Sequence, residues 1–295
     1  MSDERFVQWD GHQTWCRVVG DREAQKPPLV MLHGGPGVPH DYLESLAVVA
    51  DTGRAVVFYD QLGCGRSDRL PDAPAEFWTP DLFKRELVEL TSALGIDRHH
   101  VYGQSWGGML AMEHALERPA GLASIIVADS PASIPLWLEE TAKLRADLPD
   151  DVQEVLDRHE AAGTTEDAEY IGACMTFYER HLCRIPFPEE LMRSFGALMQ
   201  DNTVYSAMWG PSEFTCTGSL HDWDITDRLG EIDVPTLIIS GRYDEATPAV
   251  VEPVHKGIPR SEWLLCEDSS HSPHVEEHDK VVRTVTEFLE RVDGA

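Results

Sequence analysis

Short, continuous apolar runs recur along this chain, separated by segments of other patterns. Such a run, bounded by glycine- or proline-rich turns, is typical of a strand buried on both faces. Amphipathic segments, whose apolar residues recur every three to four positions, are typical of helices that cover a sheet. The alternation predicts an α/β fold: a mostly parallel sheet with helices on both faces. The predicted strands cover residues 14–19, 28–32, 55–59, 101–102, 122–128, 236–239 and 263–265.

One amphipathic segment carries clear helix boundaries. Thr79 is a suitable N-cap, Pro80 suits the first helical position, and Asp81 places negative charge in the first turn. Gly95 is typical of the residue at which a helix ends. We therefore expect a helix between these signals, with its sheet-facing leucines at positions 82, 87, 90 and 94.

The segment 131–230 breaks the alternation, because it contains no strand-like apolar run. It is interpreted as an all-helical cap inserted into an α/β core formed by residues 1–130 and 231–295. The alternative is a separate helical domain, but strand-like runs resume after residue 230, which favours an insertion. The predicted cap helices cover residues 134–148, 151–162, 167–182 and 188–200.

Composition narrows the range of partners. The 295 residues contain 42% hydrophobic and 26% charged residues, which is typical of a globular protein. The formal net charge of −28 would repel nucleic acid and anionic membranes, so we expect neither as a partner. No run approaches the roughly 20 apolar residues of a membrane span.

The N-terminal residues and the cysteines suggest a cytoplasmic protein. Residues 1–5 lack the basic start and apolar core of a signal peptide. The six cysteines are scattered and form no C-x-x-C pair, so free thiols in a reducing cytoplasm are expected. Metal-ligand spacing is also absent. We therefore expect neither a metal nor a cofactor.

Residues 103–107, Gly-Gln-Ser-Trp-Gly, fit the pattern G-x-S-x-G. The apolar pair 101–102 before them and the helix-like segment 109–117 after them give the strand–turn–helix context of a nucleophile elbow. Flanking glycines allow a turn tight enough to lift the serine oxygen clear of the backbone. A plain turn is the alternative, because so short a pattern also arises by chance. Ser105 is therefore a candidate nucleophile if the chain also supplies a base, an acid and an oxyanion hole.

A serine hydroxyl needs a base to take its proton, and a histidine oriented by a carboxylate is the common solution. Open α/β sheets carry their sites at the carboxyl ends of the strands. Asp244 follows the run 236–239 through a short turn, and His271 follows the run 263–265. The order Ser105, Asp244, His271 is also that of an α/β-hydrolase triad.

Two neighbouring residues compete for these roles. His274 is the rival base and lies nearer the final helix of the chain. Asp268 is the rival acid, but it is too close in sequence to His271 to approach it from a different loop. The pair Asp244 and His271 is therefore preferred.

The oxyanion of an acyl-transfer intermediate needs backbone N–H donors. The residue after the nucleophile, Trp106, supplies one, and the second should come from the turn after an earlier strand. That turn is the glycine-rich segment 33–37, in which Gly35 is the predicted donor. Without a triad, the same segment would be only a glycine-rich loop.

Taken together, these motifs resemble the proline iminopeptidases, serine aminopeptidases of the α/β-hydrolase fold. The resemblance runs from about residue 5 to 291 and is strongest to the archaeal tricorn-interacting aminopeptidase and to L-amino-acid amidases. Leu62 departs from the commoner family pattern, which has arginine, in a loop not expected to perform the chemistry. The motifs that carry the resemblance are residues 33–37, 60–67, 103–108, 209–214, 222–227 and 243–248.

The resemblance implies that two glutamates bind the free α-ammonium of the substrate. The matching positions are Glu213 in the cap segment and Glu245 beside Asp244. A cation taken out of water needs carboxylate partners. A surface position for Glu245 and a helix-cap role for Glu213 are the alternatives. Cap aromatics are candidates either to line an apolar side-chain pocket or to pack inside the cap: Phe177, Tyr178, Tyr205, Trp209 and Phe214.

The predicted function is hydrolysis of the bond after an unblocked N-terminal residue, in a short peptide or an amino-acid amide, through an acyl-enzyme. An aminoacyl esterase or thioesterase of a biosynthetic pathway would use the same triad and amine site. An epoxide hydrolase or dehalogenase would usually carry aspartate at position 105, and a non-catalytic binding protein would not need an intact triad. The sequence specifies neither the preferred N-terminal residue, with proline among the apolar candidates, nor the oligomeric state.

Overall fold

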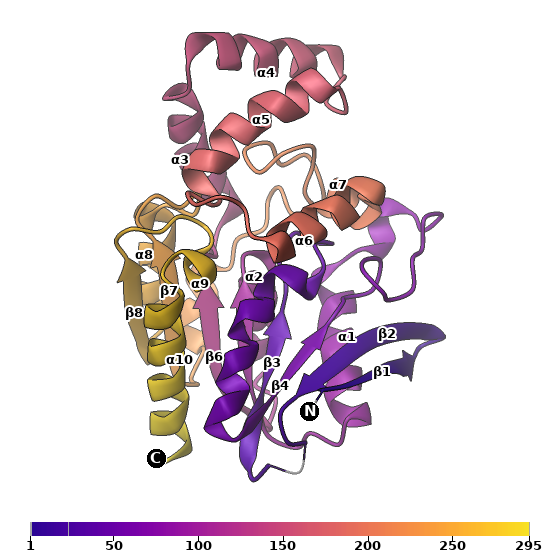
Figure 1. Ribbon diagram of the computed structural model, residues 1–295, viewed down its shortest axis with the longest axis vertical. Coiled ribbons are helices and arrows are strands. Elements are labelled where there is room, and N and C mark those ends of the chain that lie inside the picture. Colours follow the sequence, from indigo (N-terminus) through magenta and orange to yellow (C-terminus); the bar gives the residue numbers. More distant parts are fainter. Residues whose placement is uncertain (1, 23, 295) are drawn as a thin grey trace.

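The computed structural model describes residues 2–22 and 24–294, and these form an eight-stranded sheet with the order β1-β2-β4-β3-β5-β6-β7-β8 (Figure 1). β1 pairs antiparallel with β2, and β2 pairs antiparallel with β4. All later neighbours are parallel. The strands are β1 (Ser2–Trp9), β2 (His12–Val19), β3 (Lys26–Leu32), β4 (Arg54–Tyr59), β5 (His99–Gln104), β6 (Leu122–Ala128), β7 (Thr236–Gly241) and β8 (Ser261–Cys266).

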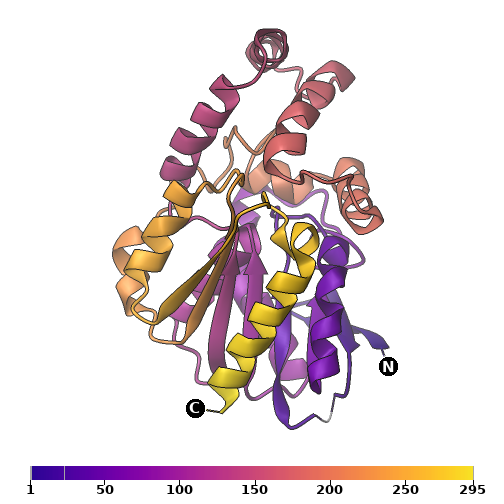
Figure 2. The same ribbon diagram turned by 60° about the vertical axis from the view of Figure 1, so that its left-hand side comes forward.

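Each face of the sheet is covered by its own apolar cluster and its own helices (Figure 2). Val30 and Leu32 of β3 belong to one cluster, and Leu29 and Met31 belong to the other, because successive side chains of a strand point to opposite faces. The helices are α1 (Pro80–Ala93), α2 (Trp106–Leu116) and α8 (Pro248–Gly257) on the first face, and η1 (His40–Thr52) and α10 (His278–Asp293) on the second.

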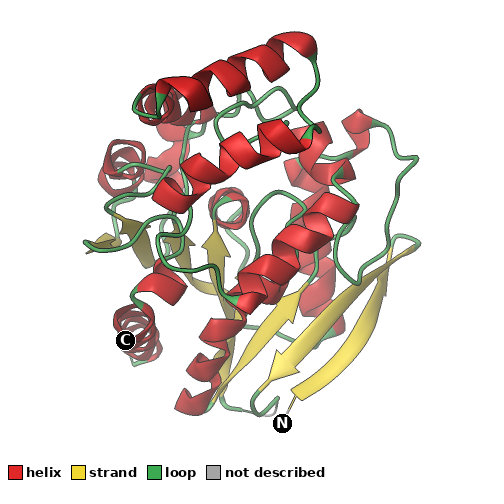
Figure 3. Ribbon diagram, turned by 45° about the horizontal axis from the view of Figure 1, so that its top comes forward, coloured by secondary structure: helices red, strands yellow, loops and turns green. Residues whose placement is uncertain are grey.

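A group of helices lies beyond the carboxyl ends of the parallel strands, where the arrowheads point in Figure 1. Figure 3 shows these helices crossing above the sheet. The outer helices α4 and α5 share an apolar cluster of their own with Phe214. The group consists of α3 (Ile134–Ala146), α4 (Asp150–Ala162), α5 (Ala168–His181), α6 (Glu189–Gln200) and α7 (Thr203–Met208). Short elements complete the chain: η2 (Ala75–Phe77), η3 (Thr226–Glu231) and α9 (Pro273–Glu276).

The predicted α/β-hydrolase fold is confirmed, and several boundaries agree with the sequence signals. The Thr79 hydroxyl accepts from the N–H of Leu82 at 3.3 Å, as expected of an N-cap, and α1 ends two residues before Gly95. The N-terminal strand β1 was not predicted, because its first residues are polar and exposed. No helix in the described part of the chain is long and apolar enough to cross a membrane.

Candidate active site

Ser105 occupies the sharp turn between β5 and α2, with backbone angles φ 56° and ψ −122°. A non-glycine residue with positive φ is strained and persists only where its surroundings require it. Glycine flanks are obligatory here, because a Cβ on Gly103 would lie 2.0 Å from the carbonyl oxygen of Gly107. The N–H of Ser105 donates to the carbonyl of Ala128 at 2.9 Å, which ties the turn to the end of β6. The structure therefore holds the Ser105 side chain at the carboxyl end of the sheet.

Asp244 and His271 meet at the same edge. Nδ1 of His271 donates to Oδ1 of Asp244 at 2.6 Å, and both side chains are buried. The same Oδ1 accepts from the N–H of Ala246 at 2.8 Å. Burial alone lowers the pKa of His271, but the charge and hydrogen bond of Asp244 raise it above its usual value, with a further contribution from Glu213. The Ser105 hydroxyl makes no hydrogen bond within the described residues, but it lines the same pocket as His271.

The rival residues are engaged elsewhere or face solvent. Nε2 of His274 donates to the backbone carbonyl of Tyr42 at 3.0 Å, and burial lowers the pKa of His274 to about 4. Asp268 is exposed, and its backbone N–H donates to Oε2 of Glu277 at 3.1 Å. The geometry therefore brings together Asp244 and His271 rather than their neighbours.

The predicted oxyanion donors flank Ser105. Gly35 has φ 106°, a left-handed conformation that favours glycine, and Trp106 is the first residue of α2. No acceptor is paired with the N–H of either residue in the part of the chain that the structure describes. The N–H groups of Gly35 and Trp106 thus have no other hydrogen bond within the described residues.

A chain of hydrogen bonds links the glycine-rich turn to the elbow and to the histidine loop. The N–H of Gly34 donates to the phenol oxygen of Tyr42 at 2.7 Å, and this hydroxyl donates to Oε1 of Gln104 at 2.6 Å. Nε2 of Gln104 donates to the carbonyl of His271 at 3.0 Å. Sequence reasoning did not single out Tyr42 or Gln104, although Gln104 is one of the two variable positions of the elbow motif.

A second glutamine bridges the two oxyanion segments. The indole Nε1 of Trp106 donates to Oε1 of Gln61 at 2.8 Å, and Nε2 of Gln61 donates to the carbonyl of His33 at 3.0 Å. The loop that carries Gln61 is held by Glu86, whose carboxylate accepts from the N–H of Leu62 at 2.9 Å. Burial raises the pKa of Glu86 to about 8. Gln61 therefore fixes the spacing between the turn 33–37 and the start of α2.

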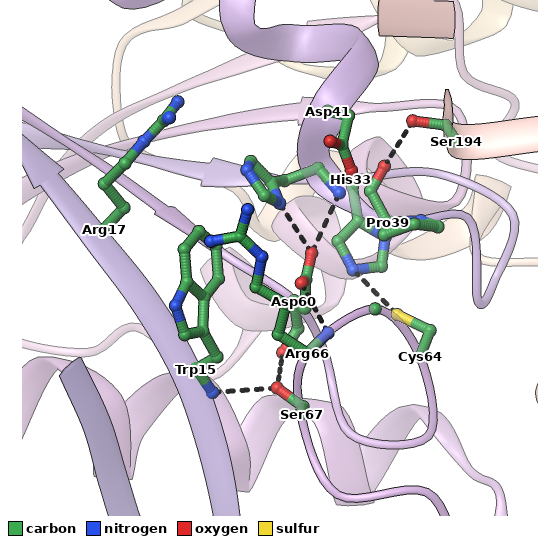
Figure 4. A network of polar contacts seen from close by, with 12 residues as sticks. Trp15, Arg17, His33, Pro39, Asp41, Asp60, Cys64, Arg66, Ser67 and Ser194 are labelled. Atoms are coloured by element: carbon green, nitrogen blue, oxygen red, sulfur yellow. Dashed lines mark hydrogen bonds and ion pairs between the residues drawn. The ribbon is translucent and has the colours of Figure 1, made fainter. Parts of the chain in front are cut away.

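The loop 60–68 has a supporting role behind the site. Figure 4 shows Asp60 at the centre of a network in which its carboxylate accepts from the Arg66 N–H at 2.8 Å. The same carboxylate accepts from Nδ1 of His40 at 2.7 Å. Burial opposes both charges, yet this pairing lowers the pKa of Asp60 and raises that of His40 to about 9. None of these three side chains lines the pocket that holds Ser105.

Glu213 and Glu245 line the pocket of Ser105 and His271. Oε1 of Glu213 accepts from the Tyr205 hydroxyl at 2.6 Å, whereas both carboxylate oxygens of the fully buried Glu245 have no hydrogen-bond partner. Burial raises the pKa of both glutamates, and for Glu245 the charges of Glu213 and Asp244 add to the effect. Two carboxylates thus face one small space whose lining residues include no lysine or arginine, and His271 is the only basic residue among them.

The apolar part of this pocket differs from the predicted set of cap aromatics. Phe177 and Phe214 pack within the outer helices, and the Tyr205 hydroxyl donates a hydrogen bond to Glu213. Sequence reasoning missed the apolar lining because its members are scattered between the loop before η1, the residue after α5, and α6. That lining consists of Val38, Leu182, Leu191 and Phe195.

Known proteins resemble this chain over nearly its whole length. Residues 27–278 match the family described as the alpha/beta hydrolase fold. The proline iminopeptidase of Lactobacillus helveticus strain DPC 4571 is 39% identical over 288 residues, 96% of each chain. That of Saccharolobus solfataricus is 41% identical over 266 residues, which cover 90% of this chain and 85% of its own.

Solved structures agree with these relatives. The crystal structure of proline iminopeptidase from Mycobacterium smegmatis is similar with a TM-score of 0.91 and 45% identity, covering 99% of both chains. The crystal structure of VinJ is similar with a TM-score of 0.96 and 47% identity, covering 98% of this chain and 99% of that one. The sequence comparisons and the structural comparisons therefore identify the same kind of relative.

Proposed function

The chain belongs to the proline iminopeptidase family, serine hydrolases of the α/β-hydrolase fold, and from this premise we propose that it releases an unblocked N-terminal residue from short peptides or amino-acid amides. The released residue is proline or another apolar residue. The observation that carries the proposal is the pair of carboxylates, the partly buried Glu213 and the fully buried Glu245, in the pocket of Ser105 and His271.

The triad residues and the oxyanion donors have distinct roles in the proposed reaction. Oγ of Ser105 attacks the substrate carbonyl carbon while Nε2 of His271 takes the hydroxyl proton. Asp244 keeps the proton of the imidazole on Nδ1. The N–H groups of Gly35 and Trp106 donate to the oxyanion. His271 then protonates the leaving amine as the C–N bond breaks, and water releases the residue from the acyl-enzyme.

The two glutamates explain why the substrate needs a free amine. An ammonium group placed between Glu213 and Glu245 would give the unpaired oxygens of Glu245 the donors that they lack. A blocked amine would leave the buried Glu245 and the partly buried Glu213 without a cation, which disfavours binding. The site thus recognises the N-terminal end of the substrate and places the first carbonyl beside Ser105.

The helices over the strand ends supply part of this recognition. Tyr205 of α7 and the following Glu213 belong to the segment 131–230, whereas Glu245 follows β7. We propose that 131–230 is a cap on a core of residues 1–130 and 231–295. Closing this cap over the substrate would exclude water from the ion pairs and strengthen them.

We also propose that the enzyme acts in the cytoplasm. The six cysteines, among them Cys64 beside His33, are free thiols, which suits a reducing cytoplasm. The partner is then a small peptide or amino-acid amide, and the strongly acidic surface disfavours nucleic acid.

Turnover of a matched set of prolyl and alanyl compounds tests the proposal: arylamides, dipeptides, esters and thioesters. We expect arylamide and dipeptide turnover in purified protein, and Ser105→Ala should abolish it. Turnover of esters and thioesters without any amide cleavage would instead favour the aminoacyl esterase. Arylamide turnover that survives Ser105→Ala would contradict the proposed mechanism.

A further inference from the structure

Asp129 is a buried acid at the end of β6 that the proposed reaction does not use. It is fully buried and has φ 52°, a left-handed conformation that a non-glycine residue adopts only at a cost in free energy. Its N–H donates to the carbonyl of Ile239 in β7 at 2.8 Å. Because β6 and β7 are parallel neighbours, this places Asp129 beside the loop that carries Asp244.

Three buried carboxylate oxygens in this region lack a donor. They are both oxygens of Asp129 and Oδ2 of Asp244. The other oxygen of Asp244, Oδ1, already accepts from His271 at 2.6 Å and from the N–H of Ala246 at 2.8 Å. The two carboxyl groups lie close enough for the charge of Asp244 to act on Asp129. Two ionised carboxylates cannot hydrogen-bond to each other, whereas a proton on one of them would give these buried oxygens a donor.

The surroundings decide which of the two acids carries that proton. Asp244 faces His271, whose imidazolium in the reaction needs a carboxylate. No lysine, arginine or histidine is among the main groups that act on Asp129 in the described residues, and burial together with the charge of Asp244 raises the pKa of Asp129 well above the usual range. The other titratable groups that face Asp129 bring no positive charge: Cys266, Glu276, Tyr42 and Tyr102.

We propose that the carboxylic acid of Asp129 donates a hydrogen bond to Oδ2 of Asp244 and thereby acts as a positioning residue for the catalytic acid. The bond fixes the rotation of the Asp244 carboxylate, so that Oδ1 stays directed at Nδ1 of His271. It also satisfies an oxygen that would otherwise be buried without a donor. Asp129 itself touches neither the substrate nor the reacting atoms.

A pair of variants separates this role from simple packing. Asparagine in Asp129→Asn keeps a donor, nearly the same volume and a tolerance for the left-handed conformation, whereas Asp129→Gly accepts the conformation and lacks a donor. We expect Asp129→Asn to retain kcat within about threefold. Asp129→Gly should lose on the order of 10- to 100-fold in kcat with little change in KM, the effect of one hydrogen bond to a charged group.

Activity should be measured on an aminoacyl arylamide and on p-nitrophenyl acetate, an ester without an amine, so that failure of the amine site does not obscure the result. The downfield proton resonance of the His271 Nδ1–H group provides a spectroscopic signature of its bond to Asp244. We expect this resonance to keep its position in Asp129→Asn and to move in Asp129→Gly. Equal loss in both variants, or wild-type kcat and an unmoved resonance in Asp129→Gly, would overturn the proposal.

If Asp129→Gly does not fold, a third measurement shows whether Asp129 is protonated. At neutral pH the wild-type protein should show an infrared carbonyl band of a protonated, buried carboxylic acid that is absent from Asp129→Asn. A difference spectrum without such a band would show that Asp129 is ionised and would overturn the proposal.

Discussion

Oε1 of Glu245 lies 3.7 Å from Nε2 of His271, so a carboxylate proposed to hold the substrate ammonium also stands next to the general base. Neither oxygen of Glu245 has a hydrogen-bond partner in the described residues. An arriving ammonium group would therefore bind Glu245 and change the charge that His271 experiences. In the proposed reaction, this contact would couple recognition of the substrate to activation of the nucleophile.

Glu245→Gln should strongly impair turnover of substrates with a free amine. We expect kcat/KM for prolyl-arylamide to fall on the order of 10²-fold, because leaving one partner of a buried charge pair without its counterion costs about 2–5 kcal/mol. Steady-state kinetics measures this change. Glu252→Gln is the matched control, since Glu252 is an exposed residue of α8 that pairs with Lys256 at 2.9 Å. Equal kinetics in the two variants would exclude an amine-binding role for Glu245.

Glu213→Gln should shift the pH dependence of an amine-free reaction. His271 must be neutral to take the Ser105 proton, so activity falls as the pH drops through its pKa, which lies above the usual value partly because of the charge of Glu213. Removing that charge lowers the pKa of His271. We therefore expect the acid limb of kcat/KM for p-nitrophenyl acetate to move to lower pH by about one unit in Glu213→Gln. A limb that stays in place or moves upward would contradict an electrostatic contribution of Glu213 to His271.

Gln61→Leu should slow the chemical step without weakening substrate binding. The substitution removes the bonds to the Trp106 indole and to the His33 carbonyl, which set the spacing of the two oxyanion segments. Complete loss of one oxyanion donor costs on the order of 10²–10³ in rate, and a displaced donor costs less, so we expect kcat to fall about tenfold at similar KM. Gln8→Leu, on the exposed side of β1, serves as the control. A raised KM at unchanged kcat would place Gln61 in substrate binding instead.

Acid should destabilise the fold through buried neutral histidines. His99 and His114 lie on neighbouring elements with ring centroids 6.0 Å apart, and their ring nitrogens have no hydrogen-bond partner in the described residues. Burial lowers the pKa of each from 6.5 to about 4. Because the unfolded chain binds these protons first, stability is fully present above pH 6.5 and is lost as the pH falls toward 4.

Urea unfolding at pH 7.5 and at pH 5 measures this loss. His114→Leu should flatten the pH dependence by about 1–2 kcal/mol, since one titrating site disappears. The variant should lose little stability at pH 7.5, because leucine fills much of the same apolar space. An unchanged difference between the two pH values would show that other groups dominate acid unfolding.

The elements that sequence predicted best are those fixed by local patterns. β6 has the predicted boundaries because its apolar run is continuous, and α1 begins at its predicted cap. Asp244 and His271 were found because parallel strands bring their carboxyl ends to one edge, so that position after a strand predicts proximity. The structure brings the two residues to 2.6 Å.

The residues that sequence missed have partners far along the chain. Gln104 meets Tyr42 and the His271 carbonyl, and Gln61 meets the Trp106 indole, across separations that no local pattern encodes. Asp129 looks like an ordinary residue after a strand until the structure shows that its oxygens lack donors. Such polar contacts depend on how loops from different strands pack, and sequence periodicity says nothing about that packing.

Binding of the free amine by Glu213 and Glu245 beside the triad can be measured as a single ratio. This ratio is kcat/KM for prolyl-p-nitroanilide divided by kcat/KM for its N-acetyl derivative, in wild type and in Glu245→Gln. We expect a wild-type ratio on the order of 10³ or more, because the acetyl group leaves the buried Glu245 and the partly buried Glu213 without a cation, and a much smaller ratio in the variant. Equal rates on the free and acetylated substrates in wild type would contradict the proposed amine-binding site.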